Sequence, residues 1–563
     1  MCLILPKGTK LYIFVFAKSG NIMKIFWKIL TVAATVFLVG NKGYAQVANF
    51  KAGKALEVQY NILRELSAGF VDSVDIEKLT NTGINAMLGS LDPYTEYIPD
   101  ENEEDLEMMR TASYGGIGAM IRKIDSVGVL ISQPYLGSPA VKFNLEPGDF
   151  ILAIDGESVL PLPVDKCSEK MKGQPGTQVK FLVRKGRTGK EEEIIVTRER
   201  VHIPDVSYSG ILRDSIGYIR HDAFTEGGSR DFRKAFEQLQ AKGVKHLVID
   251  LRGNGGGIVD EAVNILSLFL PKGTSVVSAK GRTSQSVFEM KTQTEPLDTL
   301  IPITVMVNSG SASASEIIAG AIQDLDRGVI AGTRTYGKGL VQGFRPVGYN
   351  GSLKFTTAKY YTPSGRCVQA IDYSNRNADG SVGVVPDSLK KAFKTLKKGR
   401  TVYDGGGITP DTLIKAETYS RPAYSLVAND IFGEYAIEYY KKHPSIAAPG
   451  EFALTDAEYE EFVAFASKKE FDSRSAAQAQ LDQMLKAAKN EDLYEPYKEA
   501  FDALEKSLSI SKEEMLRVKK AEFKPLLEEE IVYKYYYTPG RVESVIRNDI
   551  QLHKVLDIII GTK

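Results

Sequence analysis

A serine-rich turn and a single lysine carry the chemistry that this sequence suggests. Lys338 stands between two glycines in Tyr336-Gly337-Lys338-Gly339, and the turn before it reads Asn308-Ser309-Gly310-Ser311-Ala312-Ser313-Ala314-Ser315-Glu316. A hydroxyl beside a lysine amine that can lose its proton supplies the nucleophile and the base of a hydrolase. The two segments can do this chemistry only if the fold brings them together.

The residues between the turn and the lysine are typical of a β-α-β unit. Residues 303–307 predict a strand, residues 315–325 a helix and residues 329–331 a second strand. Right-handed winding makes the two strands neighbours, and their loops emerge at the carboxyl edge of the sheet, where open α/β sheets bind ligands. We expect Ser313 and Lys338 to meet at that edge.

A glycine loop is expected at the same edge. A predicted strand at 246–251 leads into Arg252-Gly253-Asn254-Gly255-Gly256-Gly257, and a helix is expected over 259–270. The bare N–H groups of such a loop could bind an anion or a developing oxyanion. The loop lacks the third glycine of a dinucleotide fingerprint and no suitably placed phosphate-loop lysine follows, which disfavours nucleotide binding. A tight turn that needs glycine only for a positive φ is the structural alternative.

Other interpretations of these residues stay open. The segment from Ser313 to Glu316 matches a capping box, so the serine could simply begin a helix, and most lysines are solvated surface charges. A Ser-His-Asp triad is another hydrolase arrangement, and among the five histidines His221 follows a predicted strand. Ser388-Leu389-Lys390-Lys391 has a Ser-x-x-Lys spacing, but it lies in an expected lysine-rich helix without companion motifs and is interpreted as a solvated face.

Length and composition bound the architecture. A chain of 563 residues is too long for one core, so several domains are expected. Patterning predicts a helical N-terminal region at 46–104, a β-rich domain at 105–200, an α/β core at 201–415 and a helical C-terminal domain at 416–563. The formal net charge is zero, which argues against broad nucleic-acid binding.

Residues 1–45 are interpreted as a leader. Met23 is the preferred start, because a basic segment to Lys28 precedes an apolar run at 29–39 that is too short to span a bilayer comfortably. Gly43-Tyr44-Ala45 then fits a signal-peptide cleavage site. Export to the periplasm is therefore expected, with a membrane-anchored form facing the periplasm as the alternative. Cys167 and Cys367 are expected to be two unpaired thiols.

Three ordered motifs stand out, namely Asp250-Leu251-Arg252-x-Asn254-x-Gly256-Gly257, the turn from Ser311 to Ile317, and Tyr336-Gly337-Lys338-Gly339-x-x-Gln342. They resemble the motifs of the carboxyl-terminal processing proteases, also called tail-specific proteases. The resemblance covers roughly residues 60–415. It implies a multidomain α/β protein whose protease core is related to the crotonase-like (ClpP/crotonase-type) superfamily, with no metal or organic cofactor.

The resemblance also implies roles for individual residues. Ser313 would be the nucleophile, Lys338 the general base and Gln342 the residue that orients the lysine. The N–H of Ala314 and a backbone N–H near Gly255 or Gly256 would form the oxyanion hole.

The same resemblance makes the β-rich region a PDZ domain. Tyr114-Gly115-Gly116-Ile117-Gly118-Ala119 fits its carboxylate-binding loop, with Gly116, Ile117 and Gly118 as peptide-binding residues. A PDZ domain adds a peptide as an extra strand and binds the terminal carboxylate through backbone N–H groups. Proteins or peptides with apolar C-termini are therefore the expected partners, and a mere spacer is the structural alternative. Assembly into a homodimer and binding of an adaptor protein are further expectations for the helical flanks.

Together these features predict a secreted serine endopeptidase that recognises protein C-termini and cuts through an acyl-enzyme. A free lysine with a pKa near 10.4 is a poor base at neutral pH, so the pKa of Lys338 must be lowered. Burial does this when no carboxylate lies close, and residues 332–340 contain neither Asp nor Glu. The alternative is a catalytically inactive PDZ scaffold or apolar-ligand-binding protein on the same fold, against which the intact serine, lysine and glutamine argue.

Overall fold

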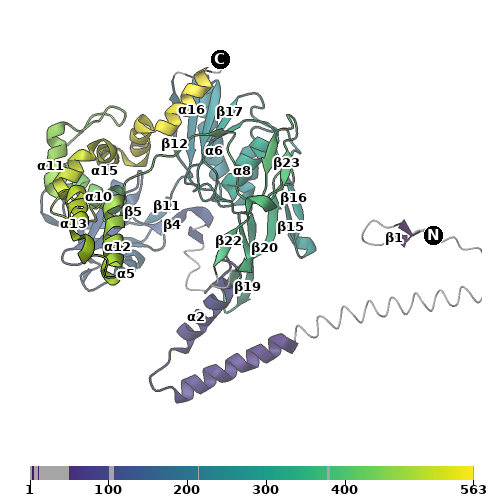
Figure 1. Cartoon of the computed structure of the whole chain (residues 1–563), viewed down its shortest axis with the longest axis horizontal. Helices are drawn as coiled ribbons and strands as arrows, with labels where there is room; N and C mark the ends of the chain where they lie inside the picture. The colour runs from purple at the N-terminus through teal and green to yellow at the C-terminus, as the bar shows by residue number, and fades with distance from the viewer. Residues whose placement is uncertain are drawn as a thin grey trace, which may run out of the picture. The chain divides into compact units, whose positions relative to one another are not determined.

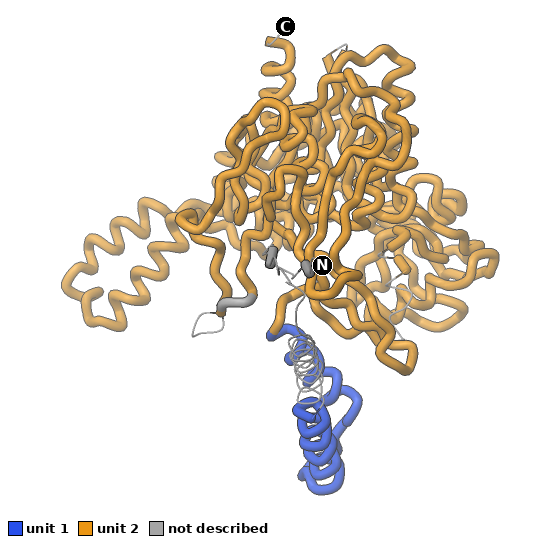
Figure 2. Tube along the Cα trace, turned by 90° about the vertical axis from the view of Figure 1, so that its right-hand side faces the viewer, with its two compact units in different colours: residues 1–90 blue, residues 91–563 orange. Residues whose placement is uncertain are grey.

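The computed structural model describes residues 3–4, 10–11, 50–99, 107–108, 110–213, 215–376 and 381–561. They belong to two units, residues 1–90 and residues 91–563 (Figure 2). In the first unit, residues 50–69 form a helix, α2 (Ile76–Gly89) follows, and β1 (Leu3–Ile4) pairs with β2 (Lys10–Leu11). The predicted apolar run and cleavage site of the leader lie outside the described residues. Within the described residues, no helix combines the length and the apolarity needed to cross a membrane.

The second unit contains a six-stranded sheet. It carries the serine turn (residues 308–316), the glycine loop (residues 252–257) and the lysine loop (residues 333–339). The strand order is β12-β13-β14-β17-β18-β25, antiparallel between β12 and β13 and parallel between all the following neighbours. The strands are β12 (Val206–Leu212), β13 (Ile216–His221), β14 (His246–Asp250), β17 (Ile303–Val307), β18 (Val329–Gly332) and β25 (Thr412–Leu413). The strands predicted at 246–251, 303–307 and 329–331 are therefore confirmed and lie side by side.

Helices cover both faces of this sheet. Leu247 and Ile249 of β14 point into a core shared with α6 (Gly228–Ala241), α7 (Val259–Leu266) and α8 (Ala314–Asp324). Val248 points to the other face, which α16 (Ile550–Gly561) covers with Leu552, Val555 and Leu556. Figure 1 shows this yellow C-terminal helix near β12 and β17. Because both faces are buried, the strands read as continuous apolar runs.

A second sheet presents the lysine loop. Its order is β16-β15-β20-β19, and β3 also pairs with β20. The lysine loop leads directly into β19, which pairs with β20. Because β3 also pairs with β20, the turn before β3 lies on the same sheet as the lysine loop. The strands are β3 (Glu96–Ile98), β15 (Ser275–Gly281), β16 (Phe288–Lys291), β19 (Leu340–Gly348) and β20 (Gly351–Tyr361), with the 3₁₀ turn η2 (Ser284–Ser286) between β15 and β16.

The segment after β20 corrects one prediction. It contains β21 (Ile371–Arg376), β22 (Val382–Val384), η3 (Asp387–Leu389), β23 (Ala392–Lys394) and β24 (Thr401–Tyr403). The Ser388-x-x-Lys391 motif thus lies in a 3₁₀ turn that leads into a strand, so the expected lysine-rich helix is wrong. Pairing of β23 with β24 overrides the helical preference of the lysines.

A β-rich region between residues 113 and 202 precedes the six-stranded sheet. The first and last strands of this region, β4 (Ser113–Gly116) and β11 (Glu199–His202), pair as a two-stranded ribbon. The strands between them form a sheet in the order β10-β9-β7-β6-β5. The strand β5 therefore lies at the edge of this sheet, and it contacts α5. Cys167 is buried in this region, and both Cys167 and Cys367 are unpaired, as expected. The remaining elements are β5 (Ala119–Ile124), β6 (Gly128–Pro134), α4 (Pro139–Lys142), β7 (Phe150–Ile154), β8 (Glu157–Ser158), α5 (Val164–Met171), β9 (Gln178–Arg184) and β10 (Glu191–Thr197).

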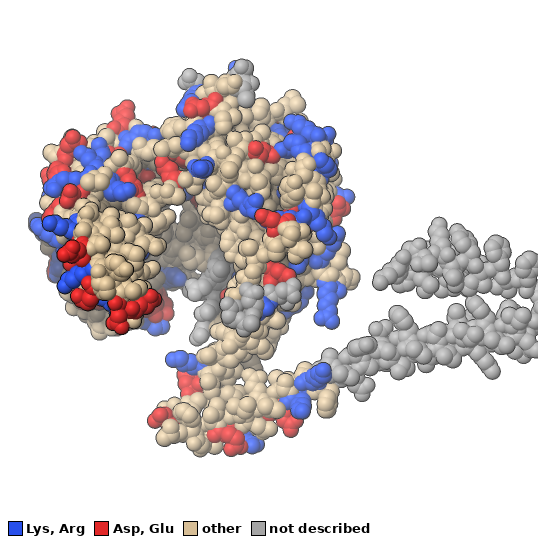
Figure 3. Space-filling view, viewed as in Figure 1, with Lys and Arg blue, Asp and Glu red and all other residues tan. Residues whose placement is uncertain are grey.

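The C-terminal helices contact the β-rich region. Arg122 of β5 forms ion pairs of 3.0 Å with both Asp430 and Glu434, and the Arg187 guanidinium lies 3.8 Å from the centre of the Tyr440 ring. The helices are α9 (Arg421–Ala428), α10 (Ile431–Lys442), α11 (Asp456–Ala466), α12 (Ala476–Asn490), α13 (Lys498–Leu508), α14 (Lys512–Val518) and α15 (Lys520–Asn548), with η4 (Glu495–Tyr497) before α13. On the face that Figure 3 shows, acidic and basic side chains are interspersed.

Candidate active site

The serine turn is fastened to the glycine loop at the carboxyl edge of the sheet. The backbone oxygen of Asn254 accepts hydrogen bonds from the N–H of Ala312 at 3.0 Å and from the Ser315 hydroxyl at 2.9 Å. The Ser311 hydroxyl donates to the Leu251 carbonyl at 2.7 Å. The strands β14 and β17 are neighbours, so these bonds join two loops that leave the same edge. The structure therefore holds the serine turn and the glycine loop as one body.

Ser313 occupies a strained backbone position at the start of α8. Its φ is 56° and its ψ −114°, a conformation that L-residues adopt rarely and that is often found at functional sites. Ser313 and Glu316 form the capping box that the sequence matched, and the Ser313 N–H donates to the Glu316 carboxylate at 3.0 Å. The start of α8 therefore combines a helix cap with a strained serine.

Two glycines near this serine differ in what their N–H groups do. A Cβ added to Gly256, whose φ is 98°, would lie 2.7 Å from the Ser313 Cβ and 2.9 Å from the Ala314 nitrogen. Its N–H, however, donates to the Asn254 side chain at 2.8 Å. Within the described residues, the N–H groups of Ala314 and Gly255 have no hydrogen-bond partner. Proximity to the serine thus favours Gly256 as an oxyanion donor, and availability favours Gly255.

Glu316 links the serine turn to the lysine loop. One carboxylate oxygen accepts from the N–H of Ser313 at 3.0 Å and of Lys338 at 2.8 Å. The other accepts from the Thr335 hydroxyl at 2.6 Å and from the Gly337 N–H at 2.8 Å. Burial raises the pKa of Glu316 to about 7, while these donors favour its charged form. The sequence indicated a helix cap at this position but not the link to the lysine.

Lys338 is half-buried and its pKa is lowered. Burial is the largest cause and the nearby charge of Lys354 adds to it, whereas Glu316 and Asp92 oppose the shift. The lowered pKa is the direction that a lysine base requires. Although the lysine loop itself lacks carboxylates, the fold brings in Glu316 and Asp92 from elsewhere in the chain.

The lysine amine lies on an aromatic ring. Lys338 Nζ is 4.3 Å from the centre of the Tyr94 ring. Within the described residues, it forms no hydrogen bond with the Ser313 hydroxyl or with Gln342, whose side chain donates to the Thr356 hydroxyl at 3.3 Å. The structure thus brings the serine and lysine loops together without closing the predicted contacts between their side chains.

His221 is not part of a Ser-His-Asp triad. Its ring is fully buried against Phe224 and Phe232, with ring centres 4.5 and 5.7 Å apart, and neither ring nitrogen has a hydrogen-bond partner among the described residues. Burial lowers its pKa to about 3. This histidine is a neutral core residue.

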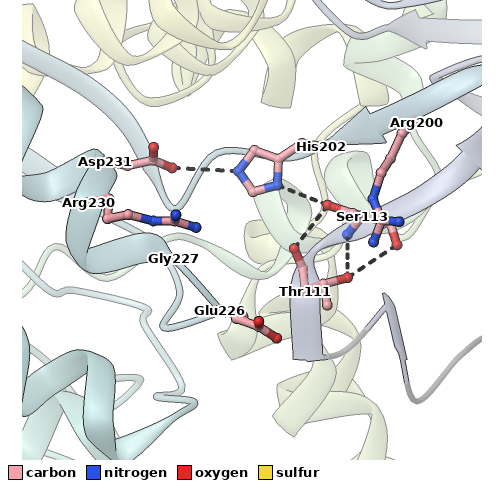
Figure 4. A pocket seen from close by; sticks show the side chains of 8 residues that line it. All are labelled: Thr111, Ser113, Arg200, His202, Glu226, Gly227, Arg230 and Asp231. Carbon is pink, nitrogen blue, oxygen red and sulfur yellow. Dashed lines mark hydrogen bonds and ion pairs between the residues drawn. The ribbon is translucent and has the colours of Figure 1, made fainter.

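A different histidine lies between a serine and an aspartate. The Ser113 hydroxyl is 3.1 Å from His202 Nδ1, and His202 Nε2 is 3.5 Å from Asp231 (Figure 4). The three residues line a pocket of about 390 Å³ together with Arg200 and Arg230, among others. The pocket joins the β4–β11 ribbon to α6. Nothing in the local sequence indicated this row, because its members come from three distant segments.

The predicted peptide-binding loop faces inward with its carbonyl groups. Gly116, Ile117 and Gly118 are all buried. The Ile117 carbonyl accepts from the Ala140 N–H at 2.7 Å, and the Gly118 carbonyl accepts from the Tyr135 N–H at 2.9 Å and from the Ser138 hydroxyl at 2.8 Å. The loop leads directly into the edge strand β5.

Comparisons with known proteins place this site in a family. Residues 215–388 match peptidase family S41, residues 130–185 a PDZ domain, and residues 422–559 the "probable PDZ-protease, C-terminal helical domain". The carboxy-terminal-processing protease of Bartonella bacilliformis is 36% identical over 315 residues, which are 55% of this chain and 72% of that protein. A probable CtpA-like serine protease of Staphylococcus epidermidis is 29% identical over 410 residues, covering 69% of this chain and 80% of that protein.

One solved structure is also similar to this chain. The photosystem II D1 C-terminal processing protease is 26% identical and covers 63% of this chain and 92% of that chain, with a TM-score of 0.34. The family match and the strained serine beside a lysine loop define a serine-type peptidase that carries a PDZ domain. The chain belongs to the carboxy-terminal-processing proteases of peptidase family S41.

Proposed function

We propose that this protein is an exported endopeptidase in which Ser313 is the nucleophile and Lys338 the general base. The observation that carries the proposal is the shared carboxylate of Glu316, one oxygen of which binds the backbone N–H groups of both residues. A single buried group thereby fixes the spacing of the nucleophile loop and the base loop. Such positioning is what converts two ordinary side chains into a catalytic pair.

The proposed reaction uses the serine hydroxyl and the lysine amine in turn. The neutral amine of Lys338 takes the hydroxyl proton as Ser313 Oγ attacks the scissile carbonyl carbon. The N–H of Ala314 and that of Gly255 or Gly256 stabilise the oxyanion. The Lys338 ammonium then gives its proton to the leaving amine, which leaves an acyl-enzyme. Water attacks the ester with Lys338 again as the base, and Ser313 is regenerated.

Recognition of a protein C-terminus is the second part of the proposal. β5 is the last strand of its sheet, and an extended peptide would pair with its outer edge as one more strand. The carbonyl groups of Ile117 and Gly118 accept hydrogen bonds from within the domain, and a terminal carboxylate would bind the backbone N–H groups of the same loop. An apolar C-terminus would then lie between β5 and α5, with Gly116, Ile117 and Gly118 around its carboxylate.

Several finer points stay predictions. Gln342 would have to turn from Thr356 toward Lys338 to orient the amine. Export to the periplasm, kinship of the core with the crotonase-like superfamily, a homodimer and an adaptor partner are proposals of the same kind. So are the domain limits at 105, 201 and 416.

A matched pair of peptides tests the proposal. A fluorogenic peptide with an apolar C-terminus is offered to the full chain as a free acid and as an amide. We expect faster cleavage of the acid, no cleavage by Ser313→Ala or Lys338→Ala, and unchanged binding by Ser313→Ala. Full activity of Lys338→Ala would refute the proposed base. Binding of the acid without any cleavage by the wild type would favour the inactive scaffold.

A further inference from the structure

The ring of Tyr94 is held rigidly in place beside the lysine. The backbone N–H of Tyr94 donates to the Asp92 carboxylate at 2.9 Å, and this hydrogen bond closes the turn before β3. The register of β3 on β20 pairs Glu96 with Lys354, and the Thr356 N–H donates to the Thr95 hydroxyl at 3.3 Å. The turn that carries the ring is therefore fixed to the same sheet that presents the lysine loop.

Two other tyrosines contact Tyr94. The Tyr94 hydroxyl lies 3.5 Å from that of Tyr336, and the rings of Tyr94 and Tyr373 are perpendicular, with their centres 6.1 Å apart. Burial raises the pKa of Tyr94, so its phenol stays neutral and acts on the lysine as an uncharged π face. The face of such a ring attracts a cation through its quadrupole.

We propose that Tyr94 is a positioning residue for Lys338. The ring of Tyr94 binds the protonated amine of Lys338 and competes with the Ser313 hydroxyl for contact with that amine. The proposal rests on the proposed role of Lys338 as the base. A neutral amine gains little from the ring, so the contact selectively stabilises the ammonium form. Tyr94 thus holds the lysine in the form that cannot accept the Ser313 proton.

Four side chains face Lys338 from the elements around it. Glu316 of α8 and Asp92 of the turn favour the ammonium form of Lys338, and the Tyr94 ring favours it too. Lys354 of β20 and the burial of Lys338 disfavour the ammonium form. Lys354 is itself paired with Glu96 at 2.7 Å, which reduces its effect on Lys338. No carboxylate forms an ion pair with Lys338 among the described residues, so the ring is the direct contact that binds the ammonium.

The pH profile of kcat/KM reports this balance. Because only the neutral amine can act as the base, activity falls on the acid side as Lys338 becomes protonated. Loss of the π face should move this acid limb to lower pH by about half a pH unit and raise activity on the limb about threefold. At a pH above the limb, activity should not change. A residue that merely supports the fold would lower activity at every pH.

Three substitutions in the full chain test the proposal. Tyr94→Leu removes the π face and keeps the bulk, Tyr94→Phe keeps the face and removes the hydroxyl, and Tyr94→Trp offers a stronger face. With the fluorogenic acid peptide, we expect the acid limb to move down for leucine, to stay for phenylalanine and to move up for tryptophan.

The outcomes separate this proposal from the proposed catalytic pair. An acid limb that stays or rises in Tyr94→Leu, or that falls in Tyr94→Phe by as much as in Tyr94→Leu, overturns the role of the ring. If Tyr94→Leu fails to fold by circular dichroism, the phenylalanine and tryptophan variants decide, and a limb that does not rise with tryptophan overturns it. Activity in Lys338→Ala would instead refute the lysine as base, whatever the Tyr94 variants do.

Discussion

Two serines in this protein lie near a possible base, and their surroundings differ. Ser113, His202 and Asp231 form a hydrogen-bonded row that looks like a catalytic triad, although it presents Nδ1 to the serine, whereas the serine-protease triad presents Nε2. The histidine and aspartate side chains are 43% and 37% exposed. Among the residues that the structure describes, Ser313 and Lys338 form no such hydrogen-bonded chain, and both are half-buried at the carboxyl edge of the six-stranded sheet.

The difference shows what a row of hydrogen bonds lacks. Around Ser313 there are strain, unpaired backbone N–H groups and a half-buried amine with a lowered pKa. Beside Ser113 the side chains of His202 and Asp231 are partly exposed, and the Ser113 hydroxyl also donates to the Thr111 carbonyl at 3.1 Å. Electrostatic preorganisation in a water-poor site contributes more to catalysis than a line of donors and acceptors. These differences favour the proposed role of Ser313 as the nucleophile over a catalytic role for Ser113.

The largest expected effect separates the two serines directly. Ser313→Ala should lower kcat at least about a thousandfold, because it removes the proposed nucleophile. Ser113→Ala and His202→Asn should change kcat by less than about twofold. Steady-state kinetics on the acid peptide measures all three. Comparable losses in Ser113→Ala and Ser313→Ala would break the distinction drawn here.

The second effect tests the tie between the serine and lysine loops. Glu316→Gln replaces one acceptor oxygen with an NH₂ group, which cannot accept from the backbone N–H groups that the carboxylate binds. We expect kcat to fall about a hundredfold through misplacement of the two loops. Substrate binding, measured in the Ser313→Ala background, should stay unchanged. Near wild-type kcat in Glu316→Gln would show that the carboxylate does not position the pair.

Glu316 also predicts a pH dependence of stability. Because its pKa in the folded protein, about 7, is raised above its ordinary value, the folded state holds the proton more tightly than the unfolded chain. The stabilising contribution is thus fully present below about pH 4.5 and is lost as pH rises through about 7, by about 3 kcal/mol at most. Urea unfolding of wild type and Glu316→Gln at pH 5 and pH 8 measures it. The wild type should lose more stability between these values than the variant, and an equal loss would contradict the prediction.

The smallest expected effect concerns the contact between the glycine loop and α16. Arg252, which precedes the glycine loop, bonds to Asp549 Oδ1 at 3.1 Å at the start of α16, whereas Asp557 of the same helix pairs with Arg213 far from the loop. Asp549→Asn should lower kcat about three- to tenfold with little change in KM, because it loosens one anchor of the loop. Asp557→Asn is the matched control and should have almost no effect. Equal effects would mean that α16 only stabilises the fold.

Local sequence patterns predicted the strands and the helix that carry the site, because each is a short element with its own periodicity. The helix predicted at 315–325 is observed at 314–324, and the strand predicted at 303–307 has the predicted limits. The sequence could not show that Tyr94 reaches Lys338 or that Asp549 reaches Arg252. These contacts depend on β3 adding to β20 and on α16 packing against the six-stranded sheet, and pairing between distant segments leaves no local pattern.

The identity of the acylated serine tests the central claim most directly. A slow peptide substrate is mixed with the full chain, the reaction is quenched with acid during turnover, and the digested protein is mapped by mass spectrometry. The acyl group should be found on the fragment that contains Ser313, equally in wild type and in His202→Asn, and it should be absent in Lys338→Ala. An acyl group on Ser113, or acylation of Ser313 at the wild-type rate without Lys338, would contradict the account.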